Sequence, residues 1–192
     1  MRIIAGHAGG RRLAAPPAST RPTTDRVREA LFSSLDAYAR EHWGGWGEVL
    51  VLDAFAGSGA VGLEAMSRGA CGATLIERDR RCLAVLRANA QAVDPRARIV
   101  AADALTWQPE GGPFAFVYVD PPYDVPDDDV RSFLDALTIG GVLAPGALAV
   151  VERSTRAEAP WPDAGWEHIR KRDYGDTALW YGQASPTAIE EA

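Results

Sequence analysis

Several features that would place this chain in a familiar class are missing from its 192 residues. It has two cysteines, Cys71 and Cys82, and no Cys or His cluster with the spacing of a zinc site, so we expect reduced thiols and no metal. No apolar run reaches about 18 residues, which argues against a membrane-spanning helix. The N-terminus lacks a charged region followed by an apolar signal core, so we predict a cytoplasmic protein.

Positive charge is scarce overall and concentrated at one end of the chain. The net charge is −6, yet residues 1–28 carry six arginines against one acid, which leaves −11 for the rest. A basic arm on an acidic body favours an anionic partner bound at that end, although a solvated arm has the same composition. The arginines that this pattern nominates for nucleic acid are Arg2, Arg11, Arg12, Arg21, Arg26 and Arg28.

The first 40 residues predict a small extension. Segments 2–5 and 11–14 flank a glycine-rich stretch and are typical of a hairpin. A linker rich in proline, serine and threonine follows over residues 16–24. Asp25 can then cap a helix that runs to about Arg40, because its apolar residues recur at helical spacing.

From residue 49 onward, strands and helices alternate, which predicts a doubly wound α/β sheet that is Rossmann-like and mostly parallel. A Gly-Asp-Thr turn near the C-terminus predicts an antiparallel hairpin added to that sheet. We expect the extension over 1–40, the sheet domain over 41–183 and a disordered tail over 184–192. The expected strands are 49–53, 73–77, 98–101, 114–119, 147–152, 166–174 and 178–181, and the expected helices are 59–68, 79–92 and 127–137.

Residues 57–62 form a literal G-x-G-x-x-G between a strand and a helix, and Glu77 lies twenty residues after Gly57. This pattern alone matches a dinucleotide site, so an NAD-linked oxidoreductase is a serious alternative. Asp53 argues against it, because an aspartate that is ionised at neutral pH would oppose a pyrophosphate at the helix N-terminus. The carboxylate of Asp53 instead suits a ligand with an ammonium and a sulfonium group, such as S-adenosylmethionine.

Two further acids favour the same cofactor. Glu77 closes the second strand and can accept hydrogen bonds from both ribose hydroxyls. Asp103 follows the third strand and can accept one from the adenine amino group, although a capping role is the simpler explanation of Asp103 alone.

The tetrapeptide Asp120-Pro121-Pro122-Tyr123 follows the apolar run 114–119. The two prolines cannot continue a central strand, so the strand ends abruptly in a rigid turn. A carboxylate, a fixed carbonyl and an aromatic face together suit a planar group that carries an NH2.

Together these residues resemble the class I S-adenosylmethionine-dependent methyltransferases with a D-P-P-Y motif. The segments Arg2-Ile3-Ile4-Ala5-Gly6, Gly10-Arg11-Arg12-Leu13 and 21–32 narrow the resemblance to the bacterial 16S rRNA guanine-N2 methyltransferase family, RsmD type. Tyr174-Gly175-Asp176-Thr177 also fits, so the resemblance covers residues 2 to about 182.

The resemblance implies a role for each matching residue. Asp120 and the Pro121 carbonyl would hold the guanine amine, and Tyr123 would stack on the base. The residues implied at the cofactor are Asp53, Ala54, Gly57, Gly59, Glu77, Arg78, Asp103, Ala104 and Asp120. The implied partner is 16S rRNA or the 30S subunit, bound by the arginines of the basic arm. Nothing in the sequence demands a partner subunit, so we expect a monomer.

Two other acceptors suit the same pocket, namely adenine N6 in DNA and a glutamine side-chain amide in a protein. The N-terminal segment favours RNA, and Asp120 stands where glutamine-directed relatives usually carry asparagine. An oxidoreductase is less favoured, because the sequence lacks a catalytic His/Lys pair or a Tyr-x-x-x-Lys motif.

Overall fold

The computed structural model describes residues 1–15 and 25–185. The predicted linker 16–24, with Arg21, and most of the predicted tail lie outside these residues. The chain divides into two compact units, Met1–Ala101 and Ala102–Ala192, each described below by itself. The boundary predicted between residues 40 and 41 stays a prediction.

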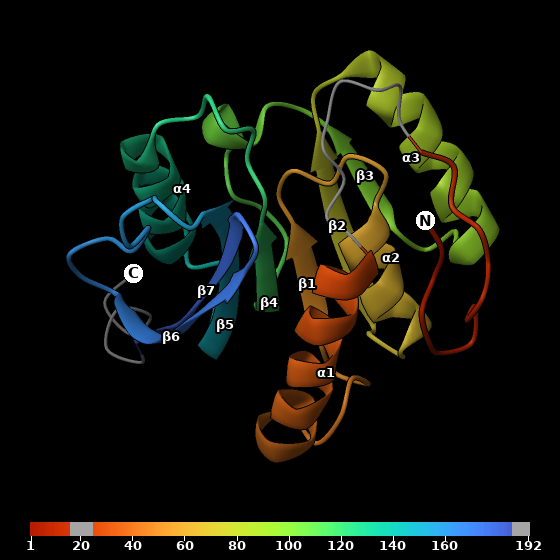
Figure 1. Cartoon of the computed structure of the whole chain (residues 1–192), viewed down its shortest axis with the longest axis horizontal. Coiled ribbons are helices and arrows are strands. Elements are labelled where there is room, and N and C mark those ends of the chain that lie inside the picture. The colour runs from red at the N-terminus through yellow and green to blue at the C-terminus, as the bar shows by residue number, and fades with distance from the viewer. Residues whose placement is uncertain (16–24, 186–192) are drawn as a thin grey trace. The chain divides into compact units, whose positions relative to one another are not determined.

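The first unit contains a parallel three-stranded sheet in the order β3-β2-β1 (Figure 1). In this sheet Asp53 is the last residue of β1, and Glu77 is the last residue of β2. The elements, in chain order, are α1 (Asp25–His42), β1 (Leu50–Asp53), α2 (Ala60–Ser67), β2 (Gly72–Glu77), α3 (Arg80–Val93) and β3 (Arg98–Ala101).

Close packing in this unit requires glycine at Gly62 in α2. A Cβ at this position would lie 2.2 Å from Leu75 Cδ2 of β2 and 3.3 Å from Asp53 Cβ. Real Cβ atoms do not approach other atoms as closely as the first of these distances, so a side chain here would push α2 away from the sheet. Gly62 therefore sets the position of α2, the helix that follows residues 54–59, which we call the glycine loop.

The N-terminal segment forms the predicted hairpin, although only one bridge, Arg2 to Arg12, has strand geometry. The hairpin is fixed to α2 by Glu64, whose side chain is fully buried. Its two carboxylate oxygens accept hydrogen bonds from the backbone N–H groups of Ile4 (2.6 Å) and Ala5 (3.0 Å). Gly6 has φ +83°, and a Cβ there would lie 1.8 Å from the Ser67 carbonyl oxygen, so only glycine fits.

The same segment also runs along α3, as Figure 1 shows. The His7 ring Nε2 lies 3.2 Å from the Val93 carbonyl oxygen. The Asn89 side chain pairs with the Ala14 backbone, accepting from its N–H (2.9 Å) and donating to its carbonyl (3.0 Å). Asn89 also donates to the Ser58 carbonyl at 2.9 Å, so one buried amide joins α3, the arm and the glycine loop.

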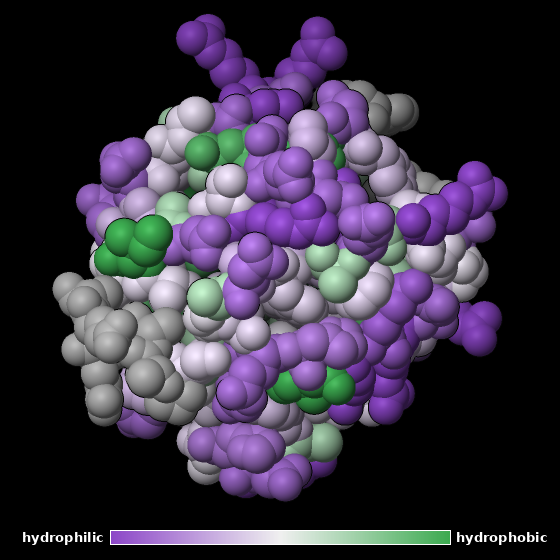
Figure 2. Space-filling view, turned by 90° about the vertical axis from the view of Figure 1, so that its left-hand side faces the viewer, coloured by the Kyte–Doolittle hydropathy of each residue, from purple (hydrophilic) through white to green (hydrophobic). Residues whose placement is uncertain are grey.

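The second unit contains four strands in the order β4-β5-β7-β6. β4 and β5 are parallel, and β5, β7 and β6 pair antiparallel. Figure 2 shows a face of the molecule that is mostly hydrophilic, with small separate hydrophobic patches. The elements are the short 3₁₀ helix η1 (Ala104–Thr106), β4 (Phe114–Val119), α4 (Asp127–Ile139), β5 (Leu143–Ser154), β6 (Trp166–Tyr174) and β7 (Thr177–Ala184).

The mostly parallel α/β arrangement with a C-terminal antiparallel hairpin was correctly predicted, with differences in extent that are largest in β5 and β7. β5 begins at Leu143, because Phe114 and Leu143 already pair before a register shift. Ala184, predicted to begin the disordered tail, is instead a buried residue of β7 that pairs with Trp166. Within residues 1–15 and 25–185, no helix is both long and apolar enough to cross a membrane.

Candidate active site

The glycine loop connects β1 to α2, and a hydrogen bond from the last residue of β2 holds it in position. Gly57 donates its N–H to Glu77 Oε2 (2.9 Å), while Glu77 Oε1 accepts from the Asp79 N–H (2.7 Å). Gly57 and Gly59 both have positive φ, +54° and +79°. A Cβ at Gly57 would meet no atom within 4 Å, so the loop leaves open space there. The loop is thus fixed in position and has open space at Gly57.

Asp53 lies beneath this loop and is 2% exposed. Its Oδ2 accepts the N–H of Gly62 at 2.9 Å, in the first turn of α2. Burial raises the pKa of Asp53 to about 7; the Gly62 hydrogen bond lowers this pKa, and the charge of Glu77 raises it. The premise that Asp53 is simply ionised at neutral pH was therefore wrong, because burial removes the water that would stabilise its charge.

The carboxylates of Asp53 and Glu77 fit a cationic ligand. Within the described part of the chain, no cation forms an ion pair with Asp53, and the nearby charge that affects its pKa is another carboxylate. A bound ammonium or sulfonium would favour the ionised form of Asp53, whereas a pyrophosphate would disfavour it. Ala54 is buried beside Asp53, and Arg78 is exposed just after Glu77. The residues present fit S-adenosylmethionine better than a dinucleotide.

Asp103 and Ala104 belong to the second unit. Asp103 is the N-cap of η1, and its Oδ1 accepts the N–H of Leu105 at 3.1 Å. Ala104 is buried. Asp103 therefore has the capping role that its sequence position suggested, and a contact between its carboxylate and adenine stays a prediction.

The acceptor loop, residues 120–126, follows β4 in the second unit. Asp120 is half-buried at the end of the strand and Pro121 is buried. The Pro122 carbonyl accepts the N–H of Val125 at 3.0 Å, which closes a turn with Tyr123 at its first central position. Tyr123 is 64% exposed, so the turn presents an aromatic ring to solvent.

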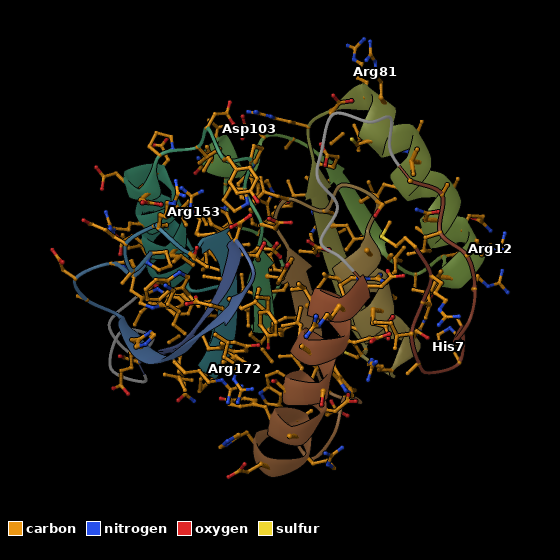
Figure 3. The ribbon with its side chains drawn as sticks, viewed as in Figure 1. His7, Arg12, Arg81, Asp103, Arg153 and Arg172 are labelled. Atoms are coloured by element: carbon orange, nitrogen blue, oxygen red, sulfur yellow. The ribbon has the colours of Figure 1, made fainter. Side chains whose placement is uncertain are left out.

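A buried arginine of β5 holds this loop in place. Arg153 donates from Nη2 to the Val125 carbonyl at 2.8 Å, and the same nitrogen lies 2.6 Å from Asp127 Oδ1 at the start of α4. Figure 3 shows Arg153 among the side chains of the second unit. Close by, the Tyr118 hydroxyl donates to the Glu152 carboxylate and ties the end of β4 to β5. The acceptor loop is therefore fixed at both ends.

The structure separates the arginines that the sequence nominated for RNA. Arg2, Arg11, Arg12 and Arg26 are exposed, and Arg21 lies outside the described residues. Arg28 is fully buried in α1, where its Nη2 donates to the Arg2 carbonyl (2.7 Å) and pairs with Asp25 (2.8 Å). The prediction that Arg28 contacts RNA disagrees with this burial, because helical spacing turns position 28 toward the core.

Sequence reasoning missed Glu64, Asn89 and Arg153, which support the site without belonging to a motif. A signal existed for Glu64, since it is the only charged residue in the otherwise apolar helix 60–67. Such a residue needs a buried partner. Arg153 offered no comparable signal, because its partners, the Val125 carbonyl and Asp127, lie far from it in the sequence.

Comparison with known proteins adds to this geometry. The sequence profile of a family described as "Conserved hypothetical protein 95" matches residues 1–183. Ribosomal RNA small subunit methyltransferase D of Escherichia coli K12 is 39% identical over 187 residues, which cover 93% of this chain and 87% of that protein. The putative rRNA methyltransferase YlbH of Bacillus subtilis 168 is 32% identical over 187 residues, covering 93% and 96%.

The likeness extends to solved structures. One, described as a putative methyltransferase yhhF from Escherichia coli, superposes with a TM-score of 0.81 at 36% identity. The match covers 97% of this chain and 98% of that one. The predicted Rossmann-like methyltransferase fold is confirmed by this match.

Proposed function

Because the chain belongs to the family described as "Conserved hypothetical protein 95", we propose that it methylates the exocyclic N2 amine of a guanine in small-subunit (16S) ribosomal RNA, with S-adenosylmethionine as methyl donor. The predicted family resemblance is confirmed by the E. coli relative, whose name is that of a small-subunit rRNA methyltransferase. The observation that carries the proposal is this relative's match over 93% of the chain, which includes both the glycine loop and the acceptor loop. An rRNA substrate places the enzyme's work in the cytoplasm.

The first unit supplies the residues that would hold the cofactor. Asp53 and the glycine loop, with Gly57 and Gly59, would take the methionine portion, and Glu77 would take the ribose. The cofactor, when bound, supplies an electrophilic methyl group on a sulfonium. Asp53 and Glu77 match the positive charge of the ammonium and sulfonium, and the open side of Gly57 leaves room for the ligand.

The second unit supplies the residues that would hold the acceptor. The lone pair of guanine N2 is delocalised into the ring, which makes it a weak nucleophile. Asp120 and the Pro121 carbonyl can each accept one N–H of this amine and direct its lone pair at the methyl group. Direct displacement would need no covalent enzyme intermediate: the N2–methyl bond would form as the sulfonium–methyl bond breaks, and the amine would give up one proton, which Asp120 can accept. Orientation supplies up to about 7–11 kcal/mol of the acceleration.

Tyr123 supports the acceptor by stacking. A base must leave its stack to be reached, which costs a few kcal/mol. An aromatic ring that stacks on the displaced base returns about 1–3 kcal/mol. The exposure of Tyr123 in a turn fixed by Val125 leaves its ring free to receive a base.

The test is a panel of acceptors offered with labelled S-adenosylmethionine. Purified protein is incubated separately with 30S subunits, naked 16S rRNA, double-stranded DNA and a release factor. Label in the rRNA of either RNA sample supports the proposal. Label confined to DNA would show an adenine-directed enzyme, label confined to the release factor would show a glutamine-directed one, and either result would overturn the proposal.

A further inference from the structure

Six exposed arginines of the first unit fall into two groups with one property in common. Three lie on the N-terminal hairpin, and three lie on α3, all of them exposed. Within residues 1–15 and 25–185, none of the six forms an ion pair, whereas Arg68, Arg96 and Arg131 pair with carboxylates. The six are Arg2, Arg11, Arg12, Arg80, Arg81 and Arg87, which we call the arginine surface.

The helix α3 has an unusual charge pattern. It has three arginines and no acidic residue. The two acids that flank it are engaged, since Asp79 caps the helix and Asp94 pairs with Arg96 at 2.7 Å. The positive charge of α3 is therefore not balanced by carboxylates of the helix itself.

The position of Arg80 and Arg81 opposes helix stability. Both lie in the first turn of α3, where the helix dipole favours anions and disfavours cations. The last turn, where a cation would be stabilising, has none. A charge pattern opposite to the one that stabilises a helix points to a role in binding.

The arm that carries one group of arginines contacts α3, which carries the other group. Asn89 and Val93 on one edge of α3 bind the arm through Ala14 and His7. Arg80 and Arg87 lie on one exposed side of α3, about two turns apart. Figure 3 shows Arg81 and Arg12 extending outward from α3 and from the arm beside it.

The residues between these arginines leave the surface accessible to a backbone. Ala84, Ala88 and Ala92 are exposed between and beyond the arginines of α3. Arginine, in turn, matches phosphate oxygens with two parallel N–H groups. A nucleic-acid backbone can therefore approach α3 closely and contact the guanidinium groups of Arg80, Arg81 and Arg87.

We propose that the arginine surface binds the phosphate backbone of the substrate RNA, so that α3 extends the basic arm into one RNA-binding surface. This proposal rests on the proposed function, which supplies the RNA. The surface contributes binding and register and touches no reacting atom. It carries no sequence information of its own, because phosphate contacts position an RNA without reading its bases.

The test compares two variants that remove equal charge. R81Q/R87Q removes two arginines of α3, and R40Q/R156Q removes two exposed arginines elsewhere in the chain. Binding of a labelled 16S rRNA transcript is measured over a series of KCl concentrations, together with the KM for RNA, kcat at saturating RNA, the Kd for S-adenosylmethionine and Tm.

The expected result is that R81Q/R87Q reduces the slope of log K against log[salt] by about two, one for each lost phosphate contact. Its KM for RNA rises, while kcat and the Kd for S-adenosylmethionine stay at wild-type values. Its Tm is unchanged or higher, because a cation leaves the first turn of α3. R40Q/R156Q keeps the wild-type slope.

Three results would overturn the proposal. The first is a wild-type slope for R81Q/R87Q. The second is an equal fall in slope for R40Q/R156Q, which would reveal an effect of net charge alone. The third is unchanged RNA binding together with lost binding to phosphatidylglycerol vesicles, which would assign the surface to a membrane. A wild-type protein that neither binds nor methylates rRNA would instead refute the proposed function.

Discussion

The two compact units of this chain carry opposite charge. Residues 1–101 have 14 arginines against 10 acids, a net charge of +4, whereas residues 102–192 have 6 basic residues against 16 acids, a net charge of −10. The first unit also holds its loop and arm through several buried polar side chains, whereas the second holds its acceptor loop through Arg153. The difference fits the proposed division of labour, in which the first unit would bind the RNA backbone and the cofactor and the second unit would bind the reacting amine.

The largest effect is expected from Asp120→Asn. The variant keeps the shape of the side chain but replaces a charged carboxylate with a neutral amide, which is a weaker acceptor and cannot take up a proton, so we expect kcat to fall by about 10²–10⁴-fold. The Kd for S-adenosylmethionine, measured by calorimetry, should stay close to that of the wild type. Asp124→Asn, which changes an exposed acid of the same loop, is the control. Lost cofactor binding in Asp120→Asn would contradict the division between the units.

Asp53→Asn tests the buried acid of the first unit. The folded-state pKa of about 7 lies above the ordinary value of 3.8, so the neutral form of Asp53 is favoured by folding. The stability associated with this neutral form is present below about pH 4 and is lost as the pH rises through about 7. In the absence of cofactor, the variant should therefore be more stable than the wild type at pH 8, by up to about 4 kcal/mol, with little difference at pH 4.

Urea unfolding of both proteins at the two pH values measures this effect. The same variant should bind S-adenosylmethionine at least about tenfold more weakly at pH 8, because a charge-assisted hydrogen bond is lost. A stability difference that does not change with pH would show that the pKa of Asp53 is not raised.

Glu64→Gln tests how the basic arm is attached. Glu64 accepts two backbone N–H groups of the hairpin and is paired with Arg68 at 2.8 Å. The amide replaces one acceptor oxygen with a donor that faces another donor, so we expect a loss of about 3 kcal/mol in unfolding free energy. Chemical denaturation measures it, with Glu29→Gln on the exposed side of α1 as control. Equal stability of the two variants would contradict the proposed anchoring.

The smallest effect is expected from Arg153→Met. Methionine preserves much of the buried volume but cannot donate to the Val125 carbonyl, so the acceptor loop loses its fixed position. A misplaced reacting group costs up to about 10²-fold in rate, and we expect kcat to fall by about 10–100-fold. The control is Arg131→Met, which removes an arginine that pairs with Asp128 on α4. Arg153→Lys should restore part of the activity, and a purely structural role would instead lower Tm without changing kcat.

The fold could be predicted almost completely from the sequence, because periodicity and glycine positions determine strands and helices locally. The ends of the strands were harder to predict, because pairing with a neighbouring strand extends a strand beyond its local sequence pattern, as in β5 and β7. In the candidate site, the motif residues were predicted from their spacing, and their roles stay predictions. Asn89 and Arg153 were missed because their partners lie far away in the chain and include backbone groups. Glu64 was missed although its charge in an apolar helix was a signal.

Two errors share one physical cause. From the sequence we predicted that Asp53 is ionised and that Arg28 is available to RNA. In the structure Arg28 is fully buried and Asp53 is almost fully buried. Burial depends on tertiary packing, which charge counting does not include. The same packing leaves Arg81 and Arg87 exposed on α3, where the sequence gave no reason to separate them from other arginines.

The most direct test of the account is the identity of the methylated nucleoside. Small-subunit rRNA is incubated with the wild-type protein and labelled S-adenosylmethionine, digested to nucleosides and separated by chromatography with mass detection. The account predicts that the label appears in N2-methylguanosine and that Asp120→Asn forms this nucleoside about 10²–10⁴-fold more slowly. Label in any other nucleoside, or equal labelling by Asp120→Asn, would contradict it.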